Sequence, residues 1–488
     1  MSAENNEKGK SKIVSGLLWK LLELGGTQGI QFVVSIILAR LLSPDEFGTI
    51  SLITIFITIA NTFVQSGFTT ALIQKKDVED PDYSSVFWIS MLLAVVMYLL
   101  LWAAAPAIAA YYAAPVLTDL LRATGVILFP GAVVSIQTAY VSRNMQFRKL
   151  FLASLIAVVI SGGAAIGFAL RGFGVWAMSL QQIIFYFALM IALFAVVSWK
   201  PAFELKILRI KELISFGWKI LAAGLLDTIW ANVYGLVIGK RFSTADLGGY
   251  NRGEQFPRII ATNLSSALQS VMLPVYSRLQ DDRARLKDML QSTIRYSAFF
   301  LFPMMAGLIA VAEPLVRVLL TDKWLFCVPY LRLLAACYVF WPVHTVNLQA
   351  INAQGKSGLF LKLEIAKKIS GIIFLCIGLL VSPLFGVTGI LIFRLVHEIV
   401  CSVLNSHPNK PSLGYGFLAQ ISDMVPAGIC SAGMCLGTMA VGKLVTLSPL
   451  PLLLLQVAAG IIFYITLSLI FNKEPVHTLM NHFGPGPF

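Results

Sequence analysis

The chain has 488 residues, of which 57% are hydrophobic and only 12% are charged. A soluble domain carries about 25% charged residues, so this composition excludes a soluble enzyme and indicates a polytopic membrane protein. The net charge of +13 would suit a nucleic-acid-binding protein. However, the basic residues lie mostly in alternate short loops, which is the topology signal of a membrane protein, and we expect no nucleic-acid partner.

Apolar segments long enough to cross a bilayer follow one another along the whole chain. One crossing needs about 20 apolar residues, and we identify fourteen such segments. They cover residues 13–40, 47–73, 84–112, 117–141, 150–170, 174–198, 216–240, 252–277, 291–320, 325–352, 358–381, 386–405, 418–441 and 449–471. The sequence therefore predicts an all-α integral membrane protein with about 14 transmembrane helices.

The second half of the chain repeats the pattern of the first half. Residues 40–48 are echoed by residues 240–248, and Phe173-Gly174-Val175 recurs as Phe385-Gly386-Val387. Six spans separate the repeats, so both halves enter the membrane in the same direction, and transporters are commonly built from two such halves. We expect two six-helix pseudo-symmetric lobes around a central cavity, with two extra C-terminal helices outside the repeat.

The repeat suggests four parts. They are an N-lobe of residues 1–198, a linker of residues 199–215, a C-lobe of residues 216–406, and a C-terminal part of residues 407–488 that holds the last two spans and a cytoplasmic tail. Apolar residues with helical spacing alternate with charged ones in the linker, which favours an amphipathic helix on the membrane surface. A solvated linker is the alternative.

The loops predict the orientation of the chain. Loops on one side of the predicted membrane hold 20 Lys and Arg residues, and loops on the other side hold 7. The richer side is expected to be cytoplasmic, so both termini should face the cytoplasm.

No catalytic signature is present in the sequence. It lacks a Walker A loop, a Gly-x-Ser-x-Gly elbow, a His-Glu-x-x-His motif and a Gly-x-Gly-x-x-Gly fingerprint. The five histidines and six cysteines have no metal-ligand spacing, so we expect no catalytic residue, no metal and no cofactor. Energy for transport would have to come from an ion gradient, the membrane potential or the substrate gradient.

Polar residues recur at steps of three and four in three spans, which places each set on one helix face. The sets are Lys20, Glu23, Thr27, Gln31 and Ser35 in the first span; Ser51, Thr54, Thr58, Asn61, Gln65 and Thr69 in the second; and Arg252, Gln255, Arg258, Thr262, Ser265 and Gln269 in the eighth. Spans two and eight are repeat equivalents, so their polar faces could line one hydrated cavity. The alternative is helix packing through polar side chains.

Charged residues inside spans are costly and tend to be functional. Arg252 and Arg258 flank Glu254, and guanidinium groups pair bidentately with phosphate oxygens, so the two arginines are candidate anion ligands. The candidates for coupling or gating are Asp227, Glu23, Glu254 and Lys20. The alternative role for these charges is an internal ion pair that fixes helix packing, for example between Asp227 and Lys219.

Spans eleven and twelve carry a further group of charges. They are Lys362, Glu364, Lys367 and Lys368 in the first of these spans and Arg394, His397 and Glu398 in the second. We expect ion pairs between two helix ends here. A groove for a lipid tail with a charged rim is the alternative.

Four stretches carry a resemblance to a known family. Gly16-Leu17-Leu18-Trp19-Lys20, residues 38–48 and Ser66-Gly67-Phe68 closely resemble the N-terminus of bacterial polysaccharide exporters of the Wzx type. These exporters, and especially their colanic-acid-exporter-like branch, belong to the multidrug/oligosaccharidyl-lipid/polysaccharide exporter superfamily. Residues 250–257 resemble the start of span eight in that branch and in lipid II flippases. The fourteen spans also match, so the resemblance covers essentially the whole chain.

The resemblance implies a flippase of the bacterial inner (cytoplasmic) membrane. Such a protein moves an undecaprenyl-diphosphate-linked oligosaccharide repeat unit from the cytoplasmic to the periplasmic leaflet by alternating access, for exopolysaccharide or lipopolysaccharide biosynthesis. Its partners would be this lipid-linked oligosaccharide, membrane lipids and the polysaccharide polymerase machinery.

The resemblance also suggests how the head group is bound. In lipid II flippases an arginine near the start of span eight serves the diphosphate, and Arg252 matches it to within one residue. Those relatives have arginines in span one, where this chain has Lys20 and Glu23. The expected substrate-binding residues are Arg252, Arg258, Gln255, Gln31, Asn61, Gln65 and Gln269.

Two other classes of protein are alternatives to the flippase. A cation-coupled multidrug exporter of the same superfamily would have an aromatic, acid-rich cavity with few arginines. A membrane glycan polymerase or ligase usually carries a large extracytoplasmic loop with catalytic Arg or His. The arginines of span eight and the short external loops favour the flippase, so we expect a transporter and not an enzyme.

Overall fold

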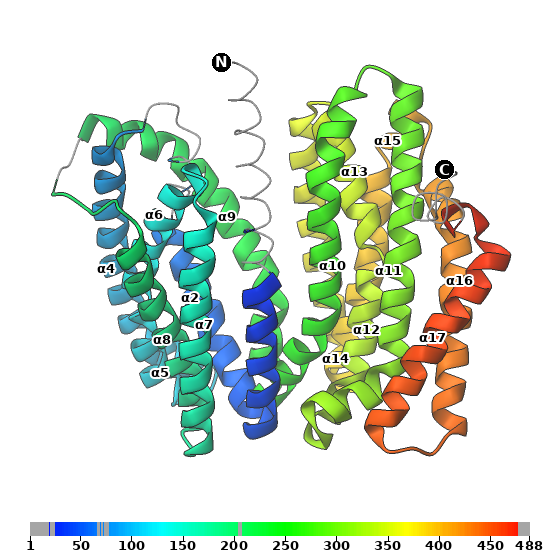
Figure 1. Cartoon of the computed structure of the whole chain (residues 1–488), viewed down its shortest axis with the longest axis horizontal. Coiled ribbons are helices and arrows are strands. Elements are labelled where there is room, and N and C mark those ends of the chain that lie inside the picture. The colour runs from blue at the N-terminus through cyan, green and yellow to red at the C-terminus, as the bar shows by residue number, and fades with distance from the viewer. Residues whose placement is uncertain are drawn as a thin grey trace, which may run out of the picture. The chain divides into compact units, whose positions relative to one another are not determined.

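The computed structural model describes residues 25–65, 78–203 and 207–476, together with the single residues Trp19, Thr69 and Leu72. Their contacts divide the chain into two compact units, Met1–Gly248 and Gly249–Phe488. Every secondary-structure element of this described part is a helix (Figure 1), which confirms the predicted all-α class.

The first unit contains a helix over residues 25–41 and seven numbered helices. They are α2 (Pro44–Gln65), α4 (Asp80–Tyr111), α5 (Leu117–Gly125), α6 (Leu128–Arg143), α7 (Phe147–Leu170), α8 (Val175–Val196) and α9 (Ile207–Arg241). Helix α10 (Thr244–Arg278) begins at the end of this unit and continues into the second. The second unit then contains α11 (Arg283–Leu320), η1 (Asp322–Cys327), α12 (Val328–Tyr338), α13 (Trp341–Ala353), α14 (Ser357–Ser406), α15 (Asn409–Leu413), α16 (Phe417–Leu444) and α17 (Pro449–Phe471).

Within the described residues, 11 helices are long and apolar enough to cross a membrane. They account for the fourteen predicted spans once three differences are considered. The first predicted span is described only from residue 25, and α10 is long enough but too polar to be counted. Helix α14 contains spans eleven and twelve, which are separated at Gly386, where φ is 58°. The predicted membrane fold is therefore confirmed.

Backbone irregularities recur in the two halves at the repeat distance. Positive φ angles occur at Ala113, Met145 and Gly174, and again 208, 210 and 212 residues later at Thr321, Gly355 and Gly386. The fourth and tenth spans are also both broken in the middle, into α5 and α6 and into α12 and α13. A bend that appears twice at the same place is expected of a duplicated six-helix unit, and this agreement confirms the pseudo-symmetric repeat.

The second and eighth spans begin with the same cap. The Ser43 hydroxyl donates to Glu46 Oε2 at 3.0 Å, and the Ser243 hydroxyl donates to Asp246 Oδ2 at 2.7 Å. In both, the acidic residue's own N–H donates back to the serine Oγ, so each cap satisfies a backbone donor that the first helical turn leaves open.

The starts of α2 and α10 approach each other at a pair of glycines. A Cβ on Gly48 would lie 1.7 Å from the carbonyl oxygen of Thr244, and a Cβ on Gly248 would lie 2.3 Å from that of Pro44. No residue with a Cβ fits either position without moving the backbone of the other helix.

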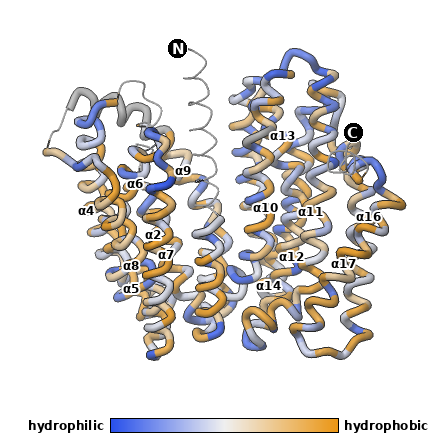
Figure 2. Tube along the Cα trace, viewed as in Figure 1, coloured by the Kyte–Doolittle hydropathy of each residue, from blue (hydrophilic) through white to orange (hydrophobic). Residues whose placement is uncertain are grey.

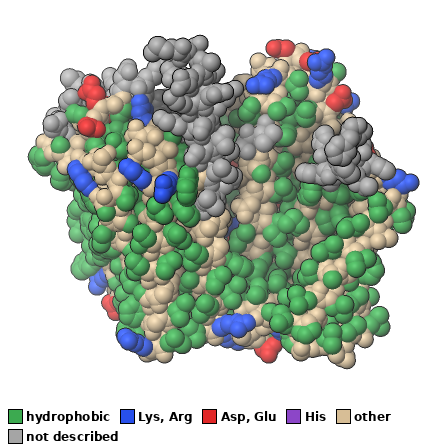
Figure 3. All heavy atoms as spheres, in the orientation of Figure 1, with side chains coloured by type: hydrophobic (Ala, Val, Ile, Leu, Met, Phe, Trp, Pro, Cys, Tyr) green, Lys and Arg blue, Asp and Glu red, His purple; other side chains and the backbone are tan. Residues whose placement is uncertain are grey.

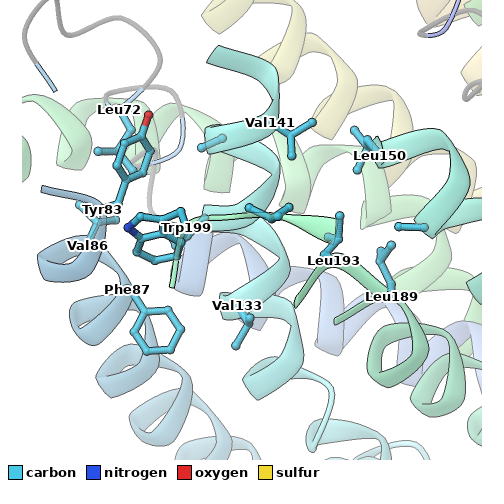
Figure 4. Close-up of a cluster of buried hydrophobic side chains, with 14 of the residues drawn as sticks. Leu72, Tyr83, Val86, Phe87, Val133, Val141, Leu150, Leu189, Leu193 and Trp199 are labelled. Carbon is cyan, nitrogen blue, oxygen red and sulfur yellow. The ribbon is translucent and has the colours of Figure 1, made fainter. Parts of the chain in front are cut away.

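Each unit has its own hydrophobic core inside an apolar surface. In the first unit, α4, α6, α7 and α8 enclose a cluster that includes Trp199, the residue shown between α4 and α6 in Figure 4. In the second unit, α10, α11, α13 and α16 enclose another. Much of the helical Cα trace of both units is orange in Figure 2, and charged side chains gather toward the helix ends in Figure 3. This distribution suits helices that are surrounded by lipid.

The predicted division into lobes is not settled by these contacts. Helix α9 packs against α2 and α4, which places it in the first unit, whereas the repeat assigns residues 216–240 to the second half. Residues 204–206 and the side chains of residues 207–216, which form most of the predicted interfacial helix, lie outside the described part. The lobes of residues 1–198 and 216–406 and the linker of residues 199–215 remain predictions.

Candidate functional site

The exposed side of α10 is largely polar. It presents Arg258, Thr262, Asn263, Ser266 and Gln269. The Thr262 hydroxyl donates to the Arg258 carbonyl at 2.8 Å, and the Ser266 hydroxyl donates to the Thr262 carbonyl at the same distance. These hydroxyl oxygens still have lone pairs that can accept hydrogen bonds. Because hydrocarbon tails offer no hydrogen bonds, a polar exposed side within a membrane helix indicates contact with water.

The exposed side of α2, the repeat equivalent of α10, is polar as well. Thr54, Thr58 and Gln65 are exposed there, in a helix whose buried residues are mostly aliphatic. The Thr58 hydroxyl donates to the Thr54 carbonyl at 2.7 Å, in the same manner as the hydroxyls of α10. By contrast, the exposed residues of the other helices include apolar ones such as Leu92 of α4 and Leu384 of α14. In each half of the chain, a described helix thus exposes several polar side chains.

The two candidate arginines of α10 lie in different surroundings. The Arg252 side chain points into the second unit, since the residue is only 8% exposed, and its Nη1 donates to Gln255 Oε1 at 2.5 Å. Arg258, less than two turns later, is exposed. In this conformation Arg258 is accessible to an anion, whereas Arg252 is held inside by Gln255.

Glu254 forms a buried ion pair with Arg394 of α14. Arg394 Nη2 donates to Glu254 Oε1 at 2.9 Å, and each side chain is 12% exposed. Arg394 Nη1 also donates to the Tyr250 hydroxyl at 2.6 Å, and the Tyr338 hydroxyl of α12 donates to Glu254 Oε1 at 3.3 Å. Charged hydrogen bonds therefore join α10 to α12 and α14. The sequence had placed Glu254 among the coupling or gating candidates but did not identify this partner.

The other predicted site residues are spread over the first unit. Gln31 and Asp227 are exposed, like Gln65, and Asn61 is half-buried beside Gly131 of α6. Lys20, Glu23 and the side chain of Lys219 lie outside the described part of the chain. The binding and coupling roles of all these residues remain predictions.

The residues predicted to form the polar stripe of α10 are not all the same as the polar residues that are exposed on this helix. Ser265 belonged to the stripe, but it is buried and lies 3.4 Å from the Thr345 hydroxyl, which donates to it. Asn263 and Ser266 are exposed and were missed. A helix allows steps of both three and four residues, so after Thr262 the spacing could not decide between Ser265 and Ser266.

The exposed residues of α2 and α10 offer hydrogen bonds and positive charge. Hydroxyl and amide groups suit the hydroxyls of sugars, and a guanidinium suits a phosphate. Within the described part of the chain, no group of three or more His, Cys, Asp or Glu side chains is placed to hold a metal ion.

The duplicated helical halves define an integral membrane protein with a fold known from solved transporters. The structure is similar to that of a lipid II flippase, MurJ, in an inward closed conformation, with a TM-score of 0.75 and 16% sequence identity over 94% of this chain and 100% of that chain. It is also similar to an inward-facing multidrug resistance transporter of the MATE family and the MOP superfamily, with a TM-score of 0.60 and 14% identity over 82% and 95% of the two chains. At these identities, the likeness shows the fold alone.

The sequence identifies the family. A family model described as polysaccharide biosynthesis protein matches residues 37–329, which is more than half of the chain, so the chain belongs to this family, in agreement with the resemblance. The succinoglycan biosynthesis transport protein ExoT of Rhizobium meliloti (strain 1021) is 30% identical over 317 residues, which are 65% of this chain and 64% of that protein. The match thus spans less than two thirds of that relative. The lipopolysaccharide biosynthesis protein WzxC of Escherichia coli (strain K12) is 20% identical over 425 residues, 84% of each chain.

Proposed function

We propose that this chain is a flippase that moves an undecaprenyl-diphosphate-linked oligosaccharide repeat unit to the periplasmic leaflet of the bacterial inner membrane by alternating access. The observation that carries the proposal is membership of the polysaccharide biosynthesis family in a chain with a membrane transporter fold. Relatives named for succinoglycan transport and for lipopolysaccharide biosynthesis support it. The multidrug transporter shares the fold, but the family match favours a polysaccharide substrate.

The polar sides of α2 and α10 suit this substrate. A diphosphate and several sugars cannot cross about 30 Å of hydrocarbon unaided. The exposed residues Thr54, Thr58 and Gln65 of α2, and Thr262, Ser266 and Gln269 of α10, would provide hydrogen bonds to the sugars. Arg258 would pair with the diphosphate, and the lipid tail would stay against the apolar helix surfaces. Arg252 would reach the diphosphate only in a conformation that breaks its hydrogen bond to Gln255.

The same proposal includes the orientation and the partners of the chain. Both termini would face the cytoplasm, because that side of the predicted topology holds 20 of the basic loop residues and the other side holds 7. The flipped repeat unit would pass to the polysaccharide polymerase machinery. The chain itself would transport its substrate without catalysing a reaction.

The test is a flipping assay in proteoliposomes. A fluorescent undecaprenyl-diphosphate oligosaccharide is reconstituted with the protein, and a membrane-impermeant quencher reports the leaflet that holds it. Protein-dependent loss of protection from the quencher is expected. No movement across several glycans, together with uptake of a cationic dye, would overturn the proposal in favour of the multidrug exporter.

Arginine variants test the diphosphate contact in the same assay. A hydrogen bond to a charged group is worth about 1.5–3 kcal/mol, so Arg258→Ala should weaken substrate binding by about tenfold or more. Arg252→Ala should also lower flipping severely while the protein still inserts. Arg285→Ala, which removes an exposed arginine paired with Asp282 after α10, is the matched control. Normal flipping by both inserted variants would refute these assignments.

A further inference from the structure

We propose that His344 and Glu398 form a proton-binding site inside the second unit, and that this proton is the coupling ion of transport. The assignment of this proton as the coupling ion rests on the proposed flippase function. From the sequence, the charges of span twelve are expected to tie helix ends together or to form the rim of a lipid groove, and His344 is not a candidate site residue.

The two side chains form a close pair between α13 and α14. His344 Nε2 lies 3.1 Å from Glu398 Oε2, and the side chains are 14% and 20% exposed. The other ring nitrogen, Nδ1, lies 3.0 Å from Asn405 Nδ2. An amide nitrogen only donates, so Nδ1 accepts, and the proton of the neutral imidazole lies on Nε2, where it donates to the carboxylate. Histidine is the side chain whose charge changes most readily near neutral pH.

Asn405 can serve both protonation states of His344. Asn405 is fully buried, and its Oδ1 has no hydrogen-bond partner among the described residues. A buried acceptor without a partner is costly. If the amide rotates by a half turn, Oδ1 faces Nδ1 and accepts a hydrogen bond from it once His344 is protonated. After this rotation, Asn405 would accept the second N–H that the protonated imidazole carries.

Glu398 shares a permanent cation with a second carboxylate. Among the groups that act on Glu398 electrostatically are His344, Arg394 and His397. Arg394 is the permanent cation of this set, and it is already paired with Glu254. Two carboxylates thus share one guanidinium, so the cluster carries one net negative charge while both histidines are neutral. A protonated His344 would place a positive charge beside Glu398 and balance it.

The remaining charges of α14 do not supply this proton site. Lys367 is paired with Glu364 at 2.5 Å, so these two charges compensate each other. His397 is buried, and its Nε2 lies 3.0 Å from the Lys367 carbonyl. His344 is the histidine that contacts Glu398 directly.

The helices packed around α13 and α14 contribute further ionisable groups. Tyr338 of α12 donates to Glu254, and Arg258 of α10 acts on Tyr338 from an exposed position, where water screens it. Arg295 of α11 is bound by Asp423 at 2.6 Å. These groups are therefore either paired with other residues or screened by water.

The first unit lacks this site at the equivalent positions. At the repeat distance of 212 residues set by Gly174 and Gly386, His344, Arg394 and Glu398 correspond to Ala132, Gln182 and Tyr186. The same fold is therefore built in the first unit without a histidine, an arginine or a carboxylate at these positions. Helix packing does not require the ionisable set, which supports a role in coupling.

The transport half is tested with ion gradients across proteoliposomes. Flipping of the undecaprenyl-diphosphate oligosaccharide is compared with and without a proton gradient, and separately with a sodium gradient. The proton gradient should change the rate in the unmodified protein, and Glu398→Gln and His344→Asn should abolish that change. Glu313→Gln and His407→Asn, which alter exposed residues of the same types, should keep it. A response to sodium alone, or a proton response that survives in both site variants, would overturn the proposal.

Proton binding is tested separately, without any substrate. Nitrogen NMR of the His344 imidazole in lipid bilayers should show a change of protonation with pH, and Glu398→Gln should alter it. If His344 of the unmodified protein kept one protonation state at every pH at which the protein stays folded, the proposed proton site would be refuted. This result would not depend on whether the variants fold. Titration of His344 in a protein that flips no lipid would support the site and overturn the flippase function instead.

Discussion

The contact between the second and the last helix of each six-helix repeat is neutral in the first unit and ionic in the second. In the first unit, Gln182 Nε2 of α8 donates to Thr54 Oγ1 of α2 at 3.0 Å. In the second, Arg394 Nη2 of α14 donates to Glu254 Oε1 of α10 at 2.9 Å. The positions correspond, since Thr54 and Glu254 are 200 residues apart, like Gly48 and Gly248, and Gln182 and Arg394 are 212 apart, like Gly174 and Gly386.

This difference shows that the repeat conserves geometry but not chemistry. A neutral hydrogen bond contributes about 0.5–1.5 kcal/mol, and its loss leaves at most one polar group unsatisfied. A buried ion pair contributes little net stability, yet removing one partner leaves an uncompensated charge. The second unit is thus expected to be sensitive to single substitutions at positions where the first unit is tolerant.

The largest expected effect is that of Arg394→Ala. It leaves Glu254 buried at 12% exposure without its cation, and the loss of one partner of such a pair costs about 3–5 kcal/mol. Gln182→Ala, at the equivalent position, should cost about 1 kcal/mol. The comparison is measured as the apparent midpoint of thermal unfolding in detergent. Equal shifts for the two variants would contradict the proposed asymmetry.

A double variant sharpens the same comparison. Arg394→Gln with Glu254→Thr places in the second unit the neutral pair of the first, so Glu254 no longer remains as a carboxylate without its cation. It should recover most of the stability that Arg394→Ala loses. A double variant as unstable as Arg394→Ala would show that Arg394 acts through other contacts, such as the Tyr250 hydroxyl.

The fold could be predicted from the sequence, because helix length and hydropathy are local properties and the repeat could be seen in short motifs. The pair of Glu254 and Arg394 could not, since 140 residues separate them and span eight offered other ion-pair partners. The inward position of Arg252 was also not predictable, because helical spacing places a residue on a face but does not tell whether that face meets water or protein. The sequence predicts a boundary between two spans near Gly386, but it does not predict the positive φ angle at this residue.

Gly48→Ala and Gly248→Ala are expected to have equal effects, because this glycine pair is a part of the repeat that is chemically conserved. The Cβ of Gly48→Ala or Gly248→Ala would lie 1.7 or 2.3 Å from a backbone carbonyl oxygen, so the starts of α2 and α10 must separate. Overpacking of this kind costs about 1–3 kcal/mol. Gly163→Ala in α7, where a Cβ meets nothing within 4 Å, is the control and should be neutral or stabilising. Thermal unfolding of the three variants checks this, and a strong effect of only one of the pair would contradict it.

The smallest effect is expected when the ionic contact is moved into the first unit. Thr54→Glu with Gln182→Arg would place there a pair like that of Glu254 and Arg394. Because Thr54 is exposed, the pair would stay solvated, and exposed ion pairs contribute about 0–1 kcal/mol. The unfolding midpoint should therefore change little.

The grafted pair should also give no new response to a proton gradient in a Glu398→Gln background, since Ala132 and Tyr186 provide neither a histidine nor a carboxylate beside it. A restored response would show that an ion pair between the second and last helices is sufficient for coupling, and that His344 is dispensable.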